Sequence, residues 1–166
     1  MREAEALVRP EAEGVVVRPI RAGDIPDALD VIRAAHAQAG TLSDRYAPVP
    51  LRRQLLAGAI RVTEGAPLFL VASWGATPVA GVLGLARSFC SAVGWELGFL
   101  AVHPACQGRG IARHLVTRAL EGARAEGGAF VLARAYHPPL FESLGFRRFD
   151  DGRPALMGAD LGTGPR

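Results

Sequence analysis

Residues 102–116 read VHPACQGRGIARHLV and mark a change of hydrophobic period along the chain. The residues just before them, Leu97 to Val102, form an apolar run of strand length. Pro104 ends this run because proline has no N–H for a sheet and restricts the residue before it. After the loop, apolar side chains recur at helical spacing: Ile111, Leu115, Val116, Ala119, Leu120 and Ala123. The stretch therefore predicts a strand, a tight loop and a helix.

Gly108 and Gly110 stand where the predicted helix begins. Glycine adopts backbone conformations that other residues avoid, and it lets a ligand approach the main chain closely. The first N–H groups of a helix have no internal partner, and the helix dipole adds partial positive charge there. Arg109 and Arg113 add two full charges, so the loop is predicted to hold a pyrophosphate. A glycine-rich turn without a ligand is the alternative.

Three phosphate-binding motifs can be compared with this loop. A P-loop requires G-x-x-x-x-G-K-[ST], and no lysine or hydroxyl residue follows Gly110 as required. A dinucleotide fingerprint, G-x-G-x-x-G, would place Arg113 where a small residue is needed. The pattern Q/R-x-x-G-x-G/A is met at every fixed position by Gln107, Gly110 and Ala112. That pattern resembles the coenzyme A pyrophosphate loop of the GNAT superfamily of N-acetyltransferases.

Other segments resemble the same superfamily in the same order. Residues 15–24 read VVVRPIRAGD, similar to a first strand and the turn before a first helix, for which Asp24 is the expected cap. Residues 141–146 read FESLGF and resemble the family's F-Y-E-x-L-G-F signature. Between these two segments, the pattern predicts a helix ending at Gly40, a second helix at 51–60, and strands at 67–74, 79–88, 95–102 and 129–133. A closing strand is predicted to begin at Phe146.

The resemblance implies an α/β (α+β) fold with a mixed, mostly antiparallel sheet of about six to seven strands. Helices are expected on both faces, and the strands at 95–102 and 129–133 are expected to splay apart. We expect one acetyltransferase domain at 14–158, a flexible leader at 1–13 and a short tail at 159–166. The 166-residue length agrees with a single domain.

Composition argues against several classes of protein: nucleic-acid binding, disulfide-rich, metal-binding and membrane proteins. The net charge is +3, all nineteen basic residues are arginines, and they are scattered, so no basic stripe indicates nucleic acid. Cys90 and Cys106 suggest no disulfide framework, and no Cys/His spacing indicates a metal. No signal peptide or membrane-length apolar run is evident. A cytoplasmic protein without a membrane partner is expected.

The resemblance assigns a donor site for acetyl-CoA. The pantetheine arm is expected to pair with the backbone of Leu100, Ala101 and Val102. The pyrophosphate is expected to take backbone N–H groups from six consecutive residues: Gln107, Gly108, Arg109, Gly110, Ile111 and Ala112. Phe141 is expected at the same site, where many family members carry a tyrosine that protonates the leaving thiolate. Phe141 has no proton to give, and that departure leaves the proton donor open.

Three residues are candidates for the chemistry. An ammonium cannot attack a thioester, so a base is needed. Glu96 lies near where such enzymes often keep a carboxylate that acts through water, and an exposed strand residue is the alternative. His137 is a second candidate base, with helix capping as its alternative role. Tyr136 could replace the missing tyrosine as proton donor.

The expected function is transfer of an acetyl group from acetyl-CoA to a primary amine of a small molecule or peptide. A non-catalytic acyl-CoA-binding or sensor module is the alternative, motivated by Phe141. The acceptor stays open among amino acids, polyamines, antibiotics and protein N-termini. Its binding region is expected within 41–60, where Arg45, Tyr46, Arg52 and Arg53 could meet it or lie on the solvated surface. The resemblance also allows a homodimer.

Overall fold

The structure, a computed structural model, describes residues 14–41, 48–60, 67–88 and 93–162. Within these ranges the strands are β1 (Val15–Pro19), β2 (Leu68–Trp74), β3 (Thr77–Arg87), β4 (Gly94–Val102), β5 (Phe130–Ala135), β6 (Arg147–Arg148) and β7 (Ala155–Asp160). The helices are α1 (Ile25–Ala39), α2 (Pro48–Ile60), α3 (Ile111–Ala125) and α4 (Pro138–Glu142), with short 3₁₀ turns at Ala22–Asp24 and Pro104–Cys106.

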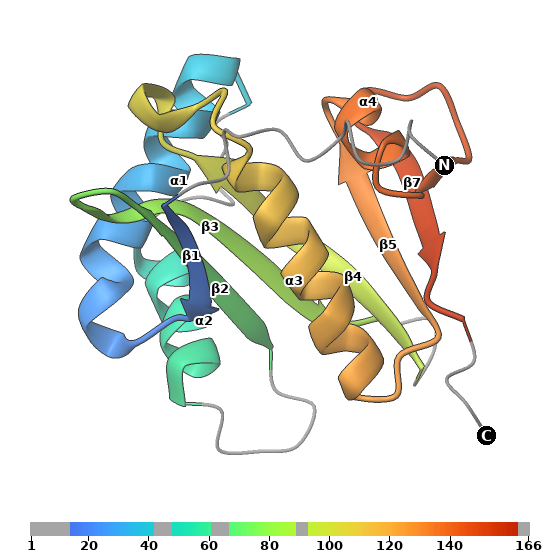
Figure 1. The fold of residues 1–166 in the computed structure, drawn as a ribbon, viewed down its shortest axis with the longest axis horizontal. Coiled ribbons are helices and arrows are strands. Elements are labelled where there is room, and N and C mark those ends of the chain that lie inside the picture. The colour runs from blue at the N-terminus through green and yellow to red at the C-terminus, as the bar shows by residue number, and fades with distance from the viewer. Residues whose placement is uncertain (1–13, 42–47, 61–66, 89–92, 163–166) are drawn as a thin grey trace.

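The described strands form one seven-stranded sheet in the order β1-β2-β3-β4-β5-β7-β6. Every neighbouring pair is antiparallel except β4 and β5, which run parallel (Figure 1). A helix, α3, connects these two parallel strands, as a parallel crossover requires. The mixed, mostly antiparallel sheet predicted from the sequence is confirmed.

The ladder between β4 and β5 is short. It pairs Gly94 with Phe130 and ends where Leu97 pairs with Ala133. Beyond that point β4 continues to Val102 on β3, while β5 continues to Ala135 on β7. The two strands therefore diverge, and Figure 1 shows the opening between them. The splay predicted from the resemblance is confirmed.

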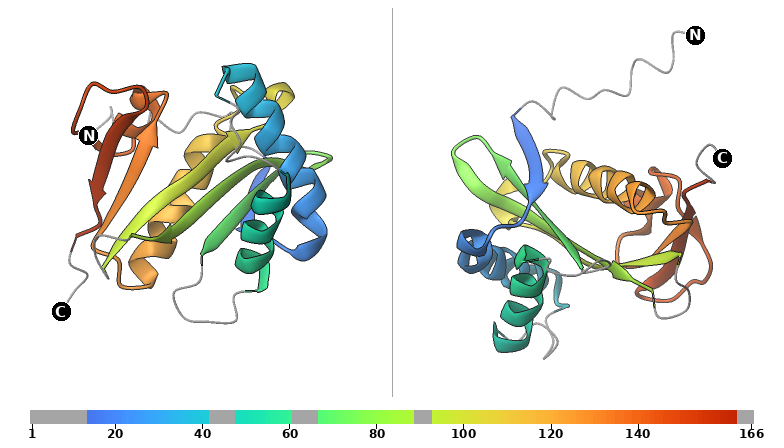
Figure 2. Two further views of the ribbon diagram at one scale, coloured as in Figure 1. Left: turned by 180° about the vertical axis from the view of Figure 1, so that it is seen from behind. Right: turned by 90° about the horizontal axis from the view of Figure 1, so that it is seen from below.

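Helices cover both faces of the sheet (Figure 2). On one face, α3 buries Leu115 and Val116 against β1–β4. On the other, α1 and α2 bury Ile32 and Leu55 in a second core. Each such side chain contributes about 1.5–3 kcal/mol when it leaves water. The sheet is thus held between two separate apolar layers.

Gly81 on β3 lets the start of α3 lie close to the sheet. A Cβ at this position would lie 2.8 Å from Cγ2 of Ile111 and 3.0 Å from Cδ1 of Leu115. Real side chains do not tolerate a carbon contact of 2.8 Å. The missing side chain therefore allows the first turn of α3 to sit beside the end of β4.

Apart from β7, the elements lie where the sequence pattern predicts them, with boundaries that shift by up to three residues. The largest shift is in helix α2, which begins at Pro48, before the predicted start at 51. Strand β7 was not located by the pattern, and it continues to Asp160, past the predicted domain end at 158. Asp24 was expected to cap α1 with its side chain, but no such hydrogen bond forms. Residues 1–13, Arg45, Tyr46 and Cys90 lie outside the described residues.

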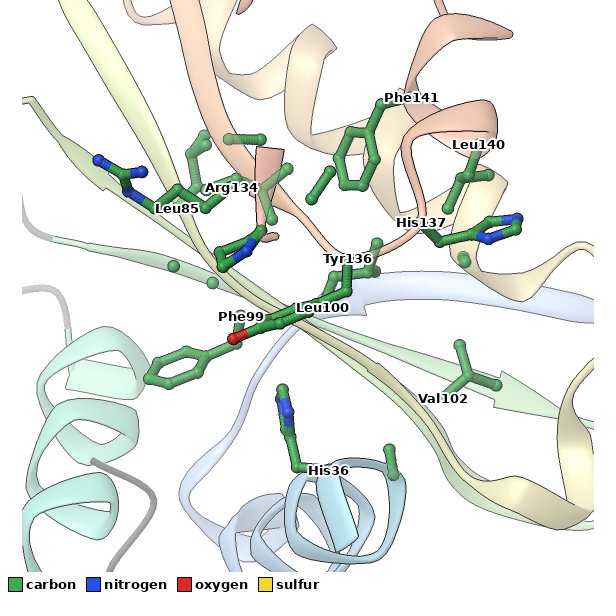
Figure 3. A pocket seen from close by; sticks show the side chains of 18 of the residues that line it. His36, Leu85, Phe99, Leu100, Val102, Arg134, Tyr136, His137, Leu140 and Phe141 are labelled. Carbon is green, nitrogen blue, oxygen red and sulfur yellow. The ribbon is translucent and has the colours of Figure 1, made fainter. Parts of the chain in front are cut away.

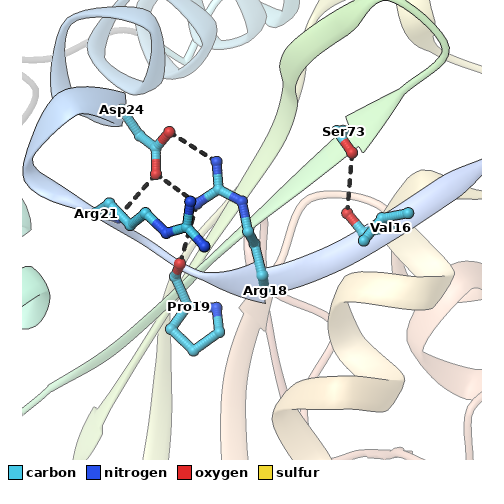
Figure 4. Close-up of polar contacts among 6 residues, drawn as sticks. All are labelled: Val16, Arg18, Pro19, Arg21, Asp24 and Ser73. Atoms are coloured by element: carbon cyan, nitrogen blue, oxygen red, sulfur yellow. Dashed lines mark hydrogen bonds and ion pairs between the residues drawn. The ribbon is translucent and has the colours of Figure 1, made fainter.

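Asp24 instead ties the turn before α1 to β1 (Figure 4). Arg18 donates two hydrogen bonds to its carboxylate, at 2.7 and 2.8 Å, and the N–H of Arg21 donates a third at 2.8 Å. The side chains of Arg18 and Asp24 are only 28% and 13% exposed. The pKa of Asp24 is lowered, foremost by the Arg18 hydrogen bond. The ionised carboxylate therefore stabilises the start of α1.

We predict that Asp24→Asn lowers the free energy of unfolding by about 1 kcal/mol at pH 7, because a partly buried, charge-assisted pair is lost. A lowered folded-state pKa gives stability that is present above the unfolded pKa and is lost as the pH falls through the folded value. The difference between variant and wild type should therefore shrink as the pH falls below the ordinary pKa of an aspartate. Urea unfolding between pH 7 and pH 3 measures it.

Glu121→Gln is the matched control, because it breaks an exposed i,i+3 pair with Arg118. Such surface pairs contribute only a few tenths of a kcal/mol, about 0.3. Equal losses for the two variants would contradict a structural role for Asp24.

Candidate functional site

A pocket of about 1550 Å³ occupies the opening between β4 and β5. It is lined by α1, α2, β2, β3, β4, the loop after β4, the start of α3, β5, α4 and β7. Figure 3 shows side chains entering it from several of these elements. Pockets for one small ligand typically measure about 300–1,000 Å³, so this pocket has room for two molecules together.

A β-bulge at Gly98 shapes the β4 wall of the pocket. Phe99 pairs with Gly84, whereas Leu97 pairs with the next residue of β3, Leu85, so Gly98 is an extra residue. As a result Leu97 and Phe99, although two residues apart, contact the cores on opposite faces of the sheet. The bulge lies where β4 leaves β5, and it changes the direction of both side chains and carbonyls there.

The backbone of β4 beyond the bulge is exposed to the pocket at alternate residues. The N–H of His103 donates to the Ala80 carbonyl of β3 at 2.8 Å. Because bonding groups alternate along a strand, those of Ala101 also point toward β3, while those of Leu100 and Val102 point into the opening. The Val102 carbonyl accepts a 3.2 Å hydrogen bond from Nε2 of Gln107. Pairing of a ligand with Ala101 therefore does not fit this strand geometry, and pairing with Leu100 and Val102 stays a prediction.

The loop after β4 presents free N–H groups at the start of α3. Gly108 and Gly110 have φ angles of 77° and 75°, a region that favours glycine because other residues are strained there. The first intrahelical bond runs from His114 N to Gly110 O at 3.1 Å. The N–H groups of residues 111–113 therefore have no partner within the helix. N–H groups without a partner at a helix start can bind an anion. That this loop holds a pyrophosphate stays a prediction.

Of the two arginines that were expected to bring charge to the loop, only one lines the pocket. The guanidinium carbon of Arg109 lies 4.4 Å from the ring centroid of Trp74, so this side chain stacks on β2 and does not line the pocket. Arg113 lines the pocket and donates to Oγ of Ser143 at 2.9 Å. Of these two loop arginines, Arg113 is thus the one whose charge lies at the pocket. Stacking on the tryptophan explains why Arg109 turns away.

Glu96 lines the pocket from β4 and is half-buried. Its Oε1 accepts a 3.1 Å hydrogen bond from Oγ of Ser88, which fixes the carboxylate. Trp95 and Leu97 contact the core under α3, so Glu96 points to the opposite face, where α1 lies. A carboxylate oriented in this way can accept a proton from water or from an amine.

Tyr136 and His137 follow β5 and line the pocket as well. In Figure 3 the ring of Tyr136 crosses the pocket toward Phe99. His137 occupies the N-cap position of α4 but makes no capping hydrogen bond through its side chain, so the alternative capping role is wrong. Both side chains are solvent-accessible and free to face a ligand.

Phe141 forms an apolar wall of the pocket. It is 5% exposed and packs edge-to-face on Phe146, with ring centroids 5.2 Å apart and an interplanar angle of 82°. The ring has no hydroxyl, so at this position the protein supplies shape and not a proton.

The sequence analysis did not single out two titratable residues, His36 and Arg134, that line the pocket. His36 enters from α1, with Nδ1 2.6 Å from Oγ1 of Thr41, and its ring points into the pocket in Figure 3. Arg134 enters from β5. The sequence could have pointed to Arg134, because it is the one charged residue in the otherwise apolar run 129–135. No local signal marks His36, because only the docking of α1 on the sheet brings it there.

The structure thus gathers eleven of the thirteen predicted site residues around one pocket, all except Ala101 and Arg109. Arg52 and Arg53 are exposed on α2 and do not line it. Among the residues that the structure describes, no group of three His, Cys, Asp or Glu side chains could hold a metal ion. Within the same ranges, no helix combines the length and apolarity needed to cross a bilayer.

This chain matches one protein-family model and is similar in fold to several solved structures. The sequence model described as an acetyltransferase (GNAT) domain matches residues 66–148, half of the chain. No curated protein matches the sequence. The PaiA N-acetyltransferase of Thermoplasma acidophilum, solved with coenzyme A, is similar with a TM-score of 0.73 and 18% identity, over 88% of this chain and 98% of that one.

Two further structures are similar over most of their length. YncA of Salmonella typhimurium, solved with acetyl-CoA, has a TM-score of 0.70 and 22% identity, over 92% of this chain and 96% of that one. A GNAT family acetyltransferase from Brucella melitensis, also in complex with acetyl-CoA, has a TM-score of 0.69 and 20% identity, over 92% of both chains. The shared fold, together with the domain match that includes β4, the glycine loop and α3, shows that this chain belongs to the GNAT acetyltransferase family.

Proposed function

We propose that this chain is an acetyl-CoA-dependent N-acetyltransferase that acetylates a primary amine of a small molecule or peptide. The observation that carries the proposal is one continuous pocket. It joins the opening between β4 and β5, the N–H groups at the start of α3 and the carboxylate of Glu96. The coenzyme A and acetyl-CoA found in the structures of PaiA and YncA support the choice of donor.

The donor would lie along β4. The amide groups of its pantetheine arm would pair with Leu100 and Val102, completing the ladder that β5 leaves open. There the ligand would compete with Gln107 for the Val102 carbonyl. The pyrophosphate would accept hydrogen bonds from the N–H groups of residues 111–113, beside the charge of Arg113. Phe141 would bound the thioester end.

The reaction in this arrangement is a direct transfer within a ternary complex. The amine nitrogen attacks the thioester carbonyl carbon, a C–N bond forms, and the C–S bond breaks. Glu96, directly or through water, accepts the proton that the amine loses. Tyr136 gives a proton to the departing thiolate, in place of the tyrosine that Phe141 replaces. Orientation of the two substrates supplies most of the remaining acceleration.

A binding-only module is the second candidate, and Phe141 is the observation that favours it. Without a hydroxyl at this wall, the domain could bind an acyl-CoA and not turn it over. The two functions differ in one measurement: only the transferase releases coenzyme A when an amine is added.

We predict that Gly110→Glu raises the dissociation constant of acetyl-CoA by about 100-fold or more, measured by isothermal titration calorimetry. A carboxylate would oppose the pyrophosphate, and a φ of 75° strains a non-glycine residue by about 1–2 kcal/mol. Gly110→Ala, which carries the strain without the charge, should weaken binding less.

Gly23→Glu is the matched control. Gly23 lies in the 3₁₀ turn before α1, in open space and without a positive φ, so the same substitution should leave binding unchanged. Wild-type affinity in Gly110→Glu would show that the loop does not hold the pyrophosphate.

We predict that Glu96→Gln lowers kcat at pH 7 by about 100-fold, because a general base contributes about 100- to 10,000-fold to such a step. Affinity for acetyl-CoA should not change, since Glu96 lies on the acceptor side. Release of coenzyme A during turnover measures kcat. Glu121→Gln, an exposed carboxylate on α3, serves as the control. Undiminished turnover in Glu96→Gln would remove Glu96 from the mechanism.

We predict that Tyr136→Phe lowers kcat by at most about 100-fold, because a thiolate leaves readily even without a proton. The same assay on His137→Gln shows whether Tyr136 or His137 gives the proton to the thiolate. A loss in His137→Gln with full activity in Tyr136→Phe would transfer the proton-donor role to His137.

A further inference from the structure

Arg134 places a positive charge on the acceptor side of the pocket. Val131, Ala133 and Ala135 of β5 face the core under α3 and α4. Because side chains alternate along a strand, Arg134 and Leu132 point to the other face, which Glu96 also occupies. Arg134 lies just past the last β4–β5 pair, where the opening begins. Figure 3 shows its side chain at the pocket together with Tyr136.

The guanidinium of Arg134 is available to a ligand. Among the described residues it makes no ion pair and no hydrogen bond. The other arginines of the pocket are engaged: Arg87 stacks 4.4 Å from the centroid of Trp95, and Arg113 donates to Ser143. Of the arginines that line the pocket, Arg134 is therefore the one placed to bind an anion on the acceptor side.

Asp150 is the acid whose charge interacts with Arg134, and other partners already satisfy it. Its Oδ1 accepts the N–H groups of Leu156 at 2.9 Å and Gly152 at 3.1 Å. The pKa of Asp150 is lowered foremost by the Leu156 N–H, then by the Gly152 N–H, and less by the Arg134 charge. Asp150 is also exposed, so water screens its attraction for Arg134.

Glu96 supplies the opposite charge nearby. It is level with Leu132 in the β4–β5 ladder, and Arg134 is one same-face step further along β5, roughly 7 Å away along the strand. A carboxylate and a guanidinium on one face, this far apart, match a ligand that carries an ammonium and a carboxylate on one carbon atom. On the same face of the sheet, the pocket is also lined by the apolar side chains of Phe69, Phe99, Leu132 and Leu156.

We propose that the acceptor is an amino acid with an apolar side chain, whose ammonium meets Glu96 and whose carboxylate meets Arg134. This inference rests on the proposed function. A guanidinium recognises a carboxylate through two parallel hydrogen bonds, which gives both affinity and orientation. The amine then faces the carboxylate that takes its proton. Amines without a neighbouring carboxylate, including polyamines, lack one of the two contacts.

The test compares leucine, phenylalanine and methionine with the amines that remain when each loses its carboxylate. Coenzyme A release gives kcat/KM for each compound, and calorimetry on the coenzyme A complex gives affinity without turnover. Wild type should prefer at least one amino acid over its decarboxylated amine by about 10- to 100-fold, the value of a hydrogen bond to a charged group. Arg134→Gln should remove that preference through KM and leave the simple amine within about twofold.

Arg147→Gln is the control, because Arg147 is an exposed arginine of β6 that does not line the pocket. Equal use of the amino acids and simple amines, or a preference that Arg134→Gln leaves intact, overturns the inference while the proposed function stands. Binding of an amino acid that depends on Arg134 but gives no transfer supports the inference and contradicts the proposed function. Failure of all three amino acids to bind or react overturns the inference.

Discussion

The parallel ladder between β4 and β5 ends after Leu97 and Ala133, and the site depends on that early end. A strand that loses its neighbour leaves backbone N–H and C=O groups to be satisfied. On β4 these groups belong to Leu100 and Val102, and within the described part of the chain the Val102 carbonyl accepts a hydrogen bond from the side chain of Gln107. A ligand with its own amides can take the place of the missing strand, which is the role proposed for the pantetheine arm.

The opening between β4 and β5 is maintained because these two strands pack against different neighbours beyond the end of their ladder. Strands β1–β4 are held between α1 and α2 on one face and α3 on the other. Beyond the ladder, β5 is held by β7, which in turn pairs with β6 and contacts α4. Gly81 brings the first turn of α3 against the sheet, so its N–H groups lie at the pocket. The position of the anion site is therefore a consequence of sheet packing.

Sequence reasoning succeeded where the cause is local. The positive φ angles of Gly108 and Gly110 are requirements of the loop itself, and the apolar stripe of α3 is a property of one helix. It failed where the cause is distant in the chain. Arg109 turns away because Trp74 of β2 lies beside it, and His36 reaches the pocket only because α1 docks on the sheet. Strand β7 was missed because its short pattern, ALMGAD, has no clear alternation.

The most direct test of the account is amide hydrogen exchange, measured residue by residue by NMR, with and without acetyl-CoA. In the free protein, Ala101 should exchange slowly because β3 holds its N–H, and Leu100 and Val102 should exchange faster. Acetyl-CoA should slow Leu100, Val102 and residues 111–113 and leave Ala101 unchanged. Binding of acetyl-CoA without protection at Leu100 and Val102 would contradict the claim that the opening between β4 and β5 is the donor site.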